Sequence, residues 1–255
     1  MKDKIQLEIC CGDLASVIAA KDGGAQRIEL CSGLYEGGLT PSIGLIKAAV
    51  GLGIRQINVL IRPRTGDFLY SDRETELMET DIKAAVLAGA SGVVIGALSP
   101  DGNIDKSVCE RLIATAKDSK RDTYITFHRA FDLSSDPFES LETIIGMGCD
   151  CLLTSGMAQS AVKGLPMLKQ LAQRAAGRIS IMAGAGVNPA NAADIITASG
   201  VTAIHSTARK PFPSKMVFRR PSVSMGAPGM NEYAPLSTSP DAVAALVKIT
   251  DSFMK

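Results

Sequence analysis

The stretch RIELCSG, residues 27–33, places three reactive side chains at every second position. Arg27, Glu29 and Cys31 alternate with Ile28 and Leu30. Successive side chains of a β-strand point to opposite faces, so an extended segment here would carry a guanidinium, a carboxylate and a thiol on one face. Such groups can bind an anion, move a proton or hold a soft metal ion. The stretch therefore predicts a strand with one chemically active face.

The same alternation recurs in other short apolar segments. It predicts inward-facing polar side chains at Glu8 and Cys10 in 5–11, Asn58 and Arg62 in 57–62, Thr126 and His128 in 123–128, and His205 in 203–206, with Arg64 continuing the side of Arg62. The alternative is a buried ionic network in which Glu8 and Glu29 pair with arginines and only support the structure.

Two of these residues suit a soft metal. Cys10 and Cys31 fall on neighbouring predicted strands at corresponding heights, so their sulfurs are candidate ligands for Cu(I). The six cysteines form no C-x-x-C or zinc-finger spacing. The alternative is that both are small apolar core residues, which is common for buried cysteine.

A second set suits acid–base chemistry on an anion. Arg62 and Arg64 could clamp an anionic group, Glu8 or Glu29 could act as general base, and His128 could act as general acid. We favour His128 over His205, the other histidine of the chain. These five residues are candidate catalytic groups.

A third set lies near two later strand ends. Gly184 and Gly186 form a tight turn in MAGAGVNPAN, while Ser206 and Arg209 follow the segment AIHS. Loops at this point of α/β barrels often hold phosphate, so the four are a candidate phosphate or anion site. The alternative is that the glycines only permit the turn.

The elements that would position these groups repeat regularly. Strands are expected at about 5–11, 27–31, 57–62, 92–97, 123–128, 151–155, 179–184 and 203–206. Glycines that suit helix ends precede them at Gly24, Gly53, Gly89, Gly148, Gly177 and Gly200. Helix starts are expected at Thr40-Pro41, Asp136-Pro137, Asn188-Pro189 and Ser239-Pro240, with capping boxes at Ser71/Glu74 and Asp136/Glu139.

Eight strand-then-helix units predict an α/β fold, a (β/α)8 TIM barrel forming a single domain over residues 1–255. An open doubly wound sheet is the rival fold, but no G-x-G-x-x-G opens a first helix. An insertion at 210–236 separates strand eight from the last helix, and we expect it to be a lid or an oligomer contact.

Composition narrows the partners. The net charge is +1 and Trp is absent, so no nucleic-acid partner is expected. The charged N-terminus does not resemble a signal peptide, and no apolar run is long enough for a membrane span. We therefore expect a cytoplasmic protein that keeps its thiols reduced and does not contact a membrane.

Several motifs together resemble the copper homeostasis protein CutC family. They are RIELCSGLYEGGLTPS, IRPRTGDFLYS, TFHRAFD, LTSG, MAGAGV and FRRPSVSMG, which run through nearly the whole chain. The resemblance implies a cytoplasmic TIM barrel, a homodimer or higher homo-oligomer, and a role in copper tolerance with Cu(I) bound through cysteine. By position, the family cysteine is Cys31, the arginines are Arg62 and Arg64, and the histidine is His128. The segment LSTSPDAV departs from the aspartate-bearing turn of the family.

Two functions remain open from the sequence. The first is copper homeostasis with Cu(I) at Cys10 and Cys31. The second is a TIM-barrel enzyme that acts on a small anionic or phosphorylated metabolite at the carboxyl-terminal mouth of the barrel.

Overall fold

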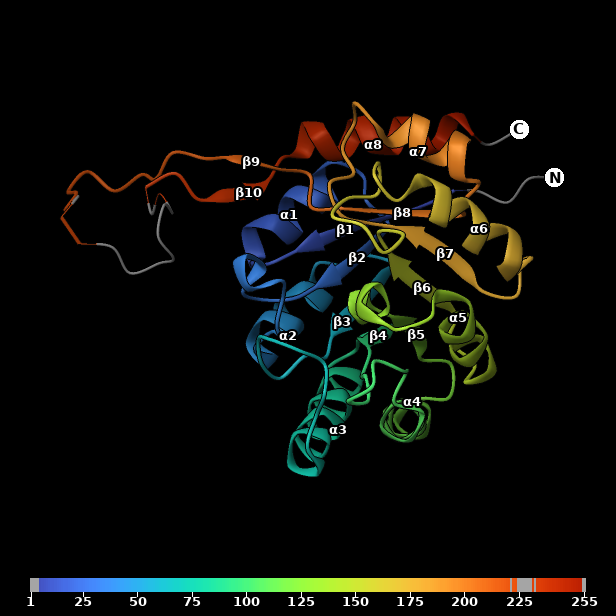
Figure 1. Cartoon of the computed structure of the whole chain (residues 1–255). Coiled ribbons are helices and arrows are strands. Elements are labelled where there is room, and N and C mark those ends of the chain that lie inside the picture. Colours follow the sequence, from blue (N-terminus) through green and yellow to red (C-terminus); the bar gives the residue numbers. More distant parts are fainter. Residues whose placement is uncertain (1–4, 221, 224–230, 232, 254–255) are drawn as a thin grey trace.

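The protein is a closed barrel of eight parallel strands with helices around it (Figure 1). The computed structural model describes residues 5–220, 222–223, 231 and 233–253. The barrel strands, in the order in which they pair, are β1 (Gln6–Cys11), β2 (Arg27–Leu30), β3 (Gln56–Leu60), β4 (Gly92–Ile95), β5 (Tyr124–Phe127), β6 (Cys151–Thr154), β7 (Ser180–Ala183) and β8 (Ala203–Ser206). Strand β8 pairs with β1 and closes the cylinder. The predicted TIM barrel is confirmed.

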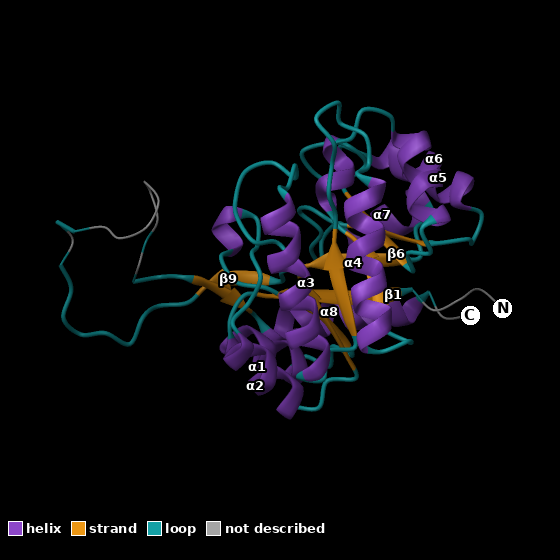
Figure 2. Ribbon diagram, turned by 90° about the horizontal axis from the view of Figure 1, so that it is seen from below, coloured by secondary structure: helices purple, strands orange, loops and turns teal. Residues whose placement is uncertain are grey.

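Helices follow the strands and cover the outside of the barrel (Figure 2). They are α1 (Leu14–Asp22), α2 (Ile43–Gly51), α3 (Asp72–Leu87), α4 (Lys106–Ser119), α5 (Pro137–Gly146), α6 (Leu165–Ala175), α7 (Ala192–Ser199) and α8 (Pro240–Ser252), with short 3-10 turns η1 (Leu34–Glu36) and η2 (Arg129–Leu133). No helix in the described part of the chain is both long and apolar enough to cross a membrane.

The predicted alternation of side chains is present in the strands. Cys11 and Ile28 belong to the large core between the strands and the helices. Cys10, Cys31 and Leu60 form a separate small cluster inside the cylinder. Period-two alternation therefore divides the side chains of each strand between the outer core and the interior.

Most of the predicted helix signals are confirmed. The six glycines expected after helices all have positive φ: Gly24, Gly53, Gly89, Gly148, Gly177 and Gly200. The capping box of Ser71 and Glu74 is complete, and Asp136 and Ser239 cap α5 and α8. The Glu139 backbone N–H donates to Asp136, which is the first half of the second predicted box.

Two predicted helix starts are wrong. The cap of α2 is Ser42, because the Thr40 hydroxyl is instead engaged with the backbone of Arg62. The N-terminal flanking residue of α7 is Asn191, and Asn188 stands in the preceding turn, where its backbone N–H donates to the Asn191 side chain.

The insertion begins as a two-stranded antiparallel ribbon. Strand β9 (Arg209–Pro211) pairs with β10 (Leu236–Thr238), and the described residues that follow β9 extend away from the barrel (Figure 1). Residues 221, 224–230 and 232 of the insertion lie outside the described residues. None of the described residues of 210–236 lines the cavity at the barrel mouth, so the lid or oligomer role stays a prediction.

Candidate functional site

A cavity of about 230 Å³ opens at the carboxyl ends of the strands. Its walls include Cys10, Glu29, Cys31, Arg62, His128 and His205. These side chains come from β1, β2, β8 and the ends of β3 and β5. The cavity lies at the mouth that carries the chemistry in barrel enzymes.

The two candidate thiols meet inside this cavity. The Sγ atoms of Cys10 and Cys31 are 3.7 Å apart, and both residues are buried. Cys10 is in register with Glu29 in the pairing of β1 and β2. Cys31 lies two residues after Glu29, so its side chain points to the same side as that of Glu29 and lies close to Cys10. The Cys31 hydrogen bond and burial together raise the pKa of the Cys10 thiol well above its usual value. The Cys10 thiol is therefore protonated in the folded protein.

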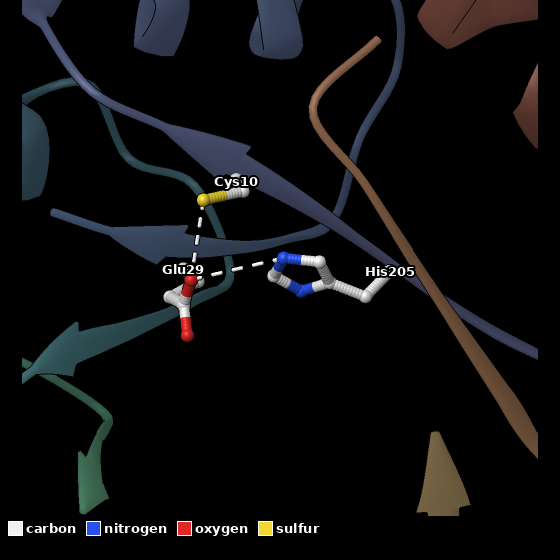
Figure 3. Close-up of side chains that lie close together, drawn as sticks. All are labelled: Cys10, Glu29 and His205. Carbon is white, nitrogen blue, oxygen red and sulfur yellow. Dashed lines mark hydrogen bonds and ion pairs between the residues drawn. The ribbon is translucent and has the colours of Figure 1, made fainter. Parts of the chain in front are cut away.

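Glu29 completes what we call the thiol cluster, which consists of Cys10, Glu29 and Cys31. The Cys10 thiol donates to the Glu29 carboxylate over 3.1 Å, and His205 approaches the same carboxylate from β8 at 3.8 Å (Figure 3). Burial raises the pKa of Glu29. The ligand atoms of Cys10, Glu29 and His205 lie within 4.8 Å of one another, a spacing that a metal ion could bridge.

Glu8 lies in a different cluster, the Glu8 network, which consists of Glu8, Arg27 and Asn58. Its Oε2 accepts from Arg27 Nε at 2.7 Å and from Asn58 Nδ2 at 2.8 Å. Although burial opposes its charge, Arg27 and His205 lower the pKa of Glu8 to about 2. Glu8 does not line the cavity, so a general-base role at the mouth does not fit its position.

His205 joins the two clusters. Its Nδ1 lies 2.9 Å from Glu8 Oε1 and its Nε2 faces Glu29. Burial opposes a charge on the ring, but the carboxylates of Glu29 and Glu8 raise the pKa of His205. The doubly protonated ring suits this position because Nδ1 then donates to Glu8 and the charged ring pairs with Glu29.

The pKa of His128 is shifted in the opposite direction from that of His205. Burial and the nearby Arg62 lower its pKa to about 3. Its Nδ1 accepts from the Ala130 backbone N–H at 3.1 Å. Only glycine fits at position 96, because a Cβ there would lie 2.6 Å from the His128 ring. His128 is thus held neutral, which does not suit the general-acid role predicted for it.

The two candidate arginines are not brought together. Arg62 lines the cavity, whereas Arg64 does not. The Arg64 side chain is 37% exposed and pairs with Asp67 and Glu74 outside the mouth. The predicted clamp of Arg62 and Arg64 is therefore not formed.

The candidate anion site at the last two strands is formed in part. Gly186, Ser206 and Arg209 line the cavity, and Gly184 does not. The Ser206 hydroxyl donates to the Val187 carbonyl and accepts from the Ala208 N–H, so its bonding links the two loops. Arg209 remains as the charged group of this set.

Sequence reasoning gave too little weight to His205 and Arg129. The alternation in residues 203–206 predicted that His205 faces inward. The same alternation could have grouped His205 with Glu29 as a candidate site residue. Arg129 follows His128 directly and lines the cavity, where its guanidinium pairs with Asp132 at 2.7 Å.

The fold and the cavity together define a TIM barrel with paired thiols, a carboxylate and an imidazole at its mouth. The chain belongs to the CutC family, whose pattern matches residues 5–210.

Relatives and a solved structure agree with this assignment. A CutC family protein from Chromobacterium violaceum is 47% identical over 249 residues, covering 98% of this chain and 99% of the relative. The human copper homeostasis protein cutC homolog is 45% identical, covering 97% of this chain and 90% of the relative. A structure of CutC from Streptococcus agalactiae has a TM-score of 0.74 at 32% identity, covering 80% of this chain and 98% of that one.

Proposed function

We propose that this protein binds Cu(I) through Cys10 and Cys31 as its part in copper homeostasis. The observation that carries the proposal is the 3.7 Å separation of the two sulfurs inside a cavity at the barrel mouth. Thiolates are soft ligands that select Cu(I), and the names of the mammalian relatives point to the same metal.

Binding requires the thiols to lose protons, because the thiolate is the ligand. The Cys10 thiol already donates to Glu29, whose pKa is raised by burial. Glu29 can therefore take the Cys10 proton as the ion arrives. The Cys31 proton leaves to solvent through the cavity, so one Cu(I) enters for each proton released and the net buried charge is unchanged.

A competition titration tests this proposal. Under anaerobic conditions, Cu(I) bound to a chromogenic chelator is titrated with the native protein, Cys10→Ala and Cys31→Ala. We expect one ion per native chain. Each variant should bind more weakly by over about 100-fold, since loss of even a partner outside the ligand set costs about 10- to 100-fold.

The matched control is Cys11→Ala. Cys11 is adjacent in sequence to Cys10 but packs in the outer core, away from the cavity. It should bind copper as the native chain does. Copper affinity that is unchanged in both Cys10→Ala and Cys31→Ala would remove the proposal.

We further propose a cytoplasmic location and a homo-oligomer of two or more chains. All six cysteines are free, as expected in a reducing compartment. The exposed insertion side chains Phe212, Val217 and Phe218 support a contact between copies. Light scattering coupled to size exclusion tests the assembly, and a monomer at micromolar concentration would contradict it.

A further inference from the structure

Three N–H donors in the walls of the cavity have no partner among the described residues. They are Arg62 Nε, His128 Nε2 and Arg209 Nε, and each atom is buried. Arg62 is 7% exposed and His128 is 5% exposed. Buried polar groups are nearly always hydrogen-bonded, so orphaned donors that share one cavity indicate a ligand.

The Arg62 guanidinium is held in place by main-chain carbonyls. Its Nη1 donates to the carbonyls of Glu36 and Gly38, and its Nη2 donates to that of Gly66. These bonds and the neighbouring Tyr70 hydroxyl engage the guanidinium without neutralising its charge. No carboxylate in the described part of the chain forms an ion pair with Arg62. A buried cation of this kind favours an anion at its remaining N–H.

His128 adds a donor of defined identity. Its Nδ1 accepts from Ala130, and the ring is neutral, so the proton must lie on Nε2. The ring packs on Phe68 at 5.0 Å between centroids, and Arg62 packs on the same phenyl ring at 5.0 Å. The two donors therefore stand on one side of the cavity around Phe68.

Arg209 supplies a charge from the other side. It follows β8, and strands β3 and β5 lie across the closed barrel from β8. Its guanidinium lies over the Tyr35 ring at 5.6 Å. The remaining arginine of the wall, Arg129, is already neutralised by Asp132. Among the described residues neither Arg62 nor Arg209 has a carboxylate in an ion pair, so two positive charges face one small space.

We propose that this cavity binds a small oxyanion, the carboxylate or phosphate group of a metabolite, through Arg62 Nε, His128 Nε2 and Arg209 Nε. The volume of about 230 Å³ restricts the ligand to a small molecule. The anion lies beside the thiol cluster and shares no ligand with it. The inference therefore does not rest on copper binding.

Thermal unfolding of the metal-free protein tests this inference, with orthophosphate and malonate as probes at constant ionic strength. We expect a saturable rise in Tm, which reaches about 5–10 °C at one hundred times Kd. Selective stabilisation by orthophosphate assigns a phosphate group, and selective stabilisation by malonate assigns a carboxylate. Stabilisation by both supports the shared oxyanion chemistry, and none by either overturns it.

Two variants locate the anion. His128→Asn keeps a side-chain acceptor for the Ala130 N–H and removes the Nε2 donor. Arg209→Met removes the guanidinium but keeps a long side chain, and it serves alone if His128→Asn does not fold. Each should raise Kd by about 10- to 100-fold, the value of a hydrogen bond to a charged group.

Arg64→Met is the charge-matched control, because Arg64 stands outside the cavity with carboxylate partners of its own. It should bind the probe as the native chain does. An equal loss in Arg64→Met and Arg209→Met would show general charge attraction and overturn the site. The double variant Cys10→Ala, Cys31→Ala should retain anion binding, which separates this site from the copper site.

Discussion

The interior of the barrel holds two carboxylates on adjacent strands, and their surroundings differ. In the Glu8 network, the carboxylate receives Arg27, Asn58 and His205, and its pKa falls to about 2. In the thiol cluster, Glu29 receives a thiol at 3.1 Å and an imidazole at 3.8 Å, and burial raises its pKa.

This difference distinguishes a carboxylate that stabilises the fold from one that can take part in binding. A buried charge with a full set of donors is stable and inert, whereas one with few donors readily takes a proton or a cation. Only the residue with few donors, Glu29, reaches the cavity. The Glu8 network thus fixes the charge and the position of His205 next to the thiol cluster.

The largest expected effect comes from Arg27→Met. Arg27 is 4% exposed and is the ion-pair partner of Glu8, so its loss leaves an uncompensated buried carboxylate. We expect the free energy of unfolding to fall by about 3–5 kcal/mol, measured by urea denaturation at pH 7. The surface variant Arg178→Met, which breaks an exposed pair with Glu142, should cost at most about 1 kcal/mol. Similar losses in both variants would mean that Glu8 is not a buried structural charge.

A smaller effect is expected from acid. The pKa of Glu8 is lowered from 4.5 to about 2 in the folded state, so its charge stabilises the fold above pH 4.5 and that stabilisation is lost as the pH falls toward 2. The shift corresponds to about 3 kcal/mol in full, of which roughly half is lost by pH 3.5. Urea denaturation between pH 6 and 3.5 should show a flatter profile for Glu8→Gln than for the native chain. Parallel profiles would contradict this assignment.

The sequence predicted the barrel and the inward residues because both follow from local periodicity. The alternation in residues 27–31 needs no knowledge of neighbours, and neither do the glycines at helix ends. The same reasoning was wrong for Arg64, which was expected to lie on the same side as Arg62 and does not line the cavity. Strand β3 ends at Leu60, and alternation carries no information once the chain leaves the extended conformation. Arg62 still reaches the cavity, whereas Arg64 turns to Glu74 and Asp67.

The roles of the two histidines could not be predicted in this way. His128 and His205 both lie at strand ends, and the sequence favoured His128 for proton transfer, whereas the pKa of His128 is lowered and that of His205 is raised. Their charges depend on partners from distant segments: Glu8 lies 197 positions from His205, and Arg62 stands beside His128. Electrostatic surroundings of this kind arise only when the barrel closes.

The smallest expected effect on stability, and the sharpest test of the contrast, is Glu29→Gln. Because burial raises the pKa of Glu29, the charged form of this carboxyl group opposes folding, and a neutral amide of the same shape removes that opposition. We expect urea denaturation to show a change of less than about 1 kcal/mol, in either direction, whereas Glu8→Gln should cost several times more. The same Glu29→Gln protein should bind Cu(I) more weakly in the chelator competition, since the thiol proton of Cys10 loses its acceptor. A Glu29→Gln protein as unstable as Glu8→Gln, with copper affinity intact, would place Glu29 among the supporting residues and erase the distinction between the two clusters.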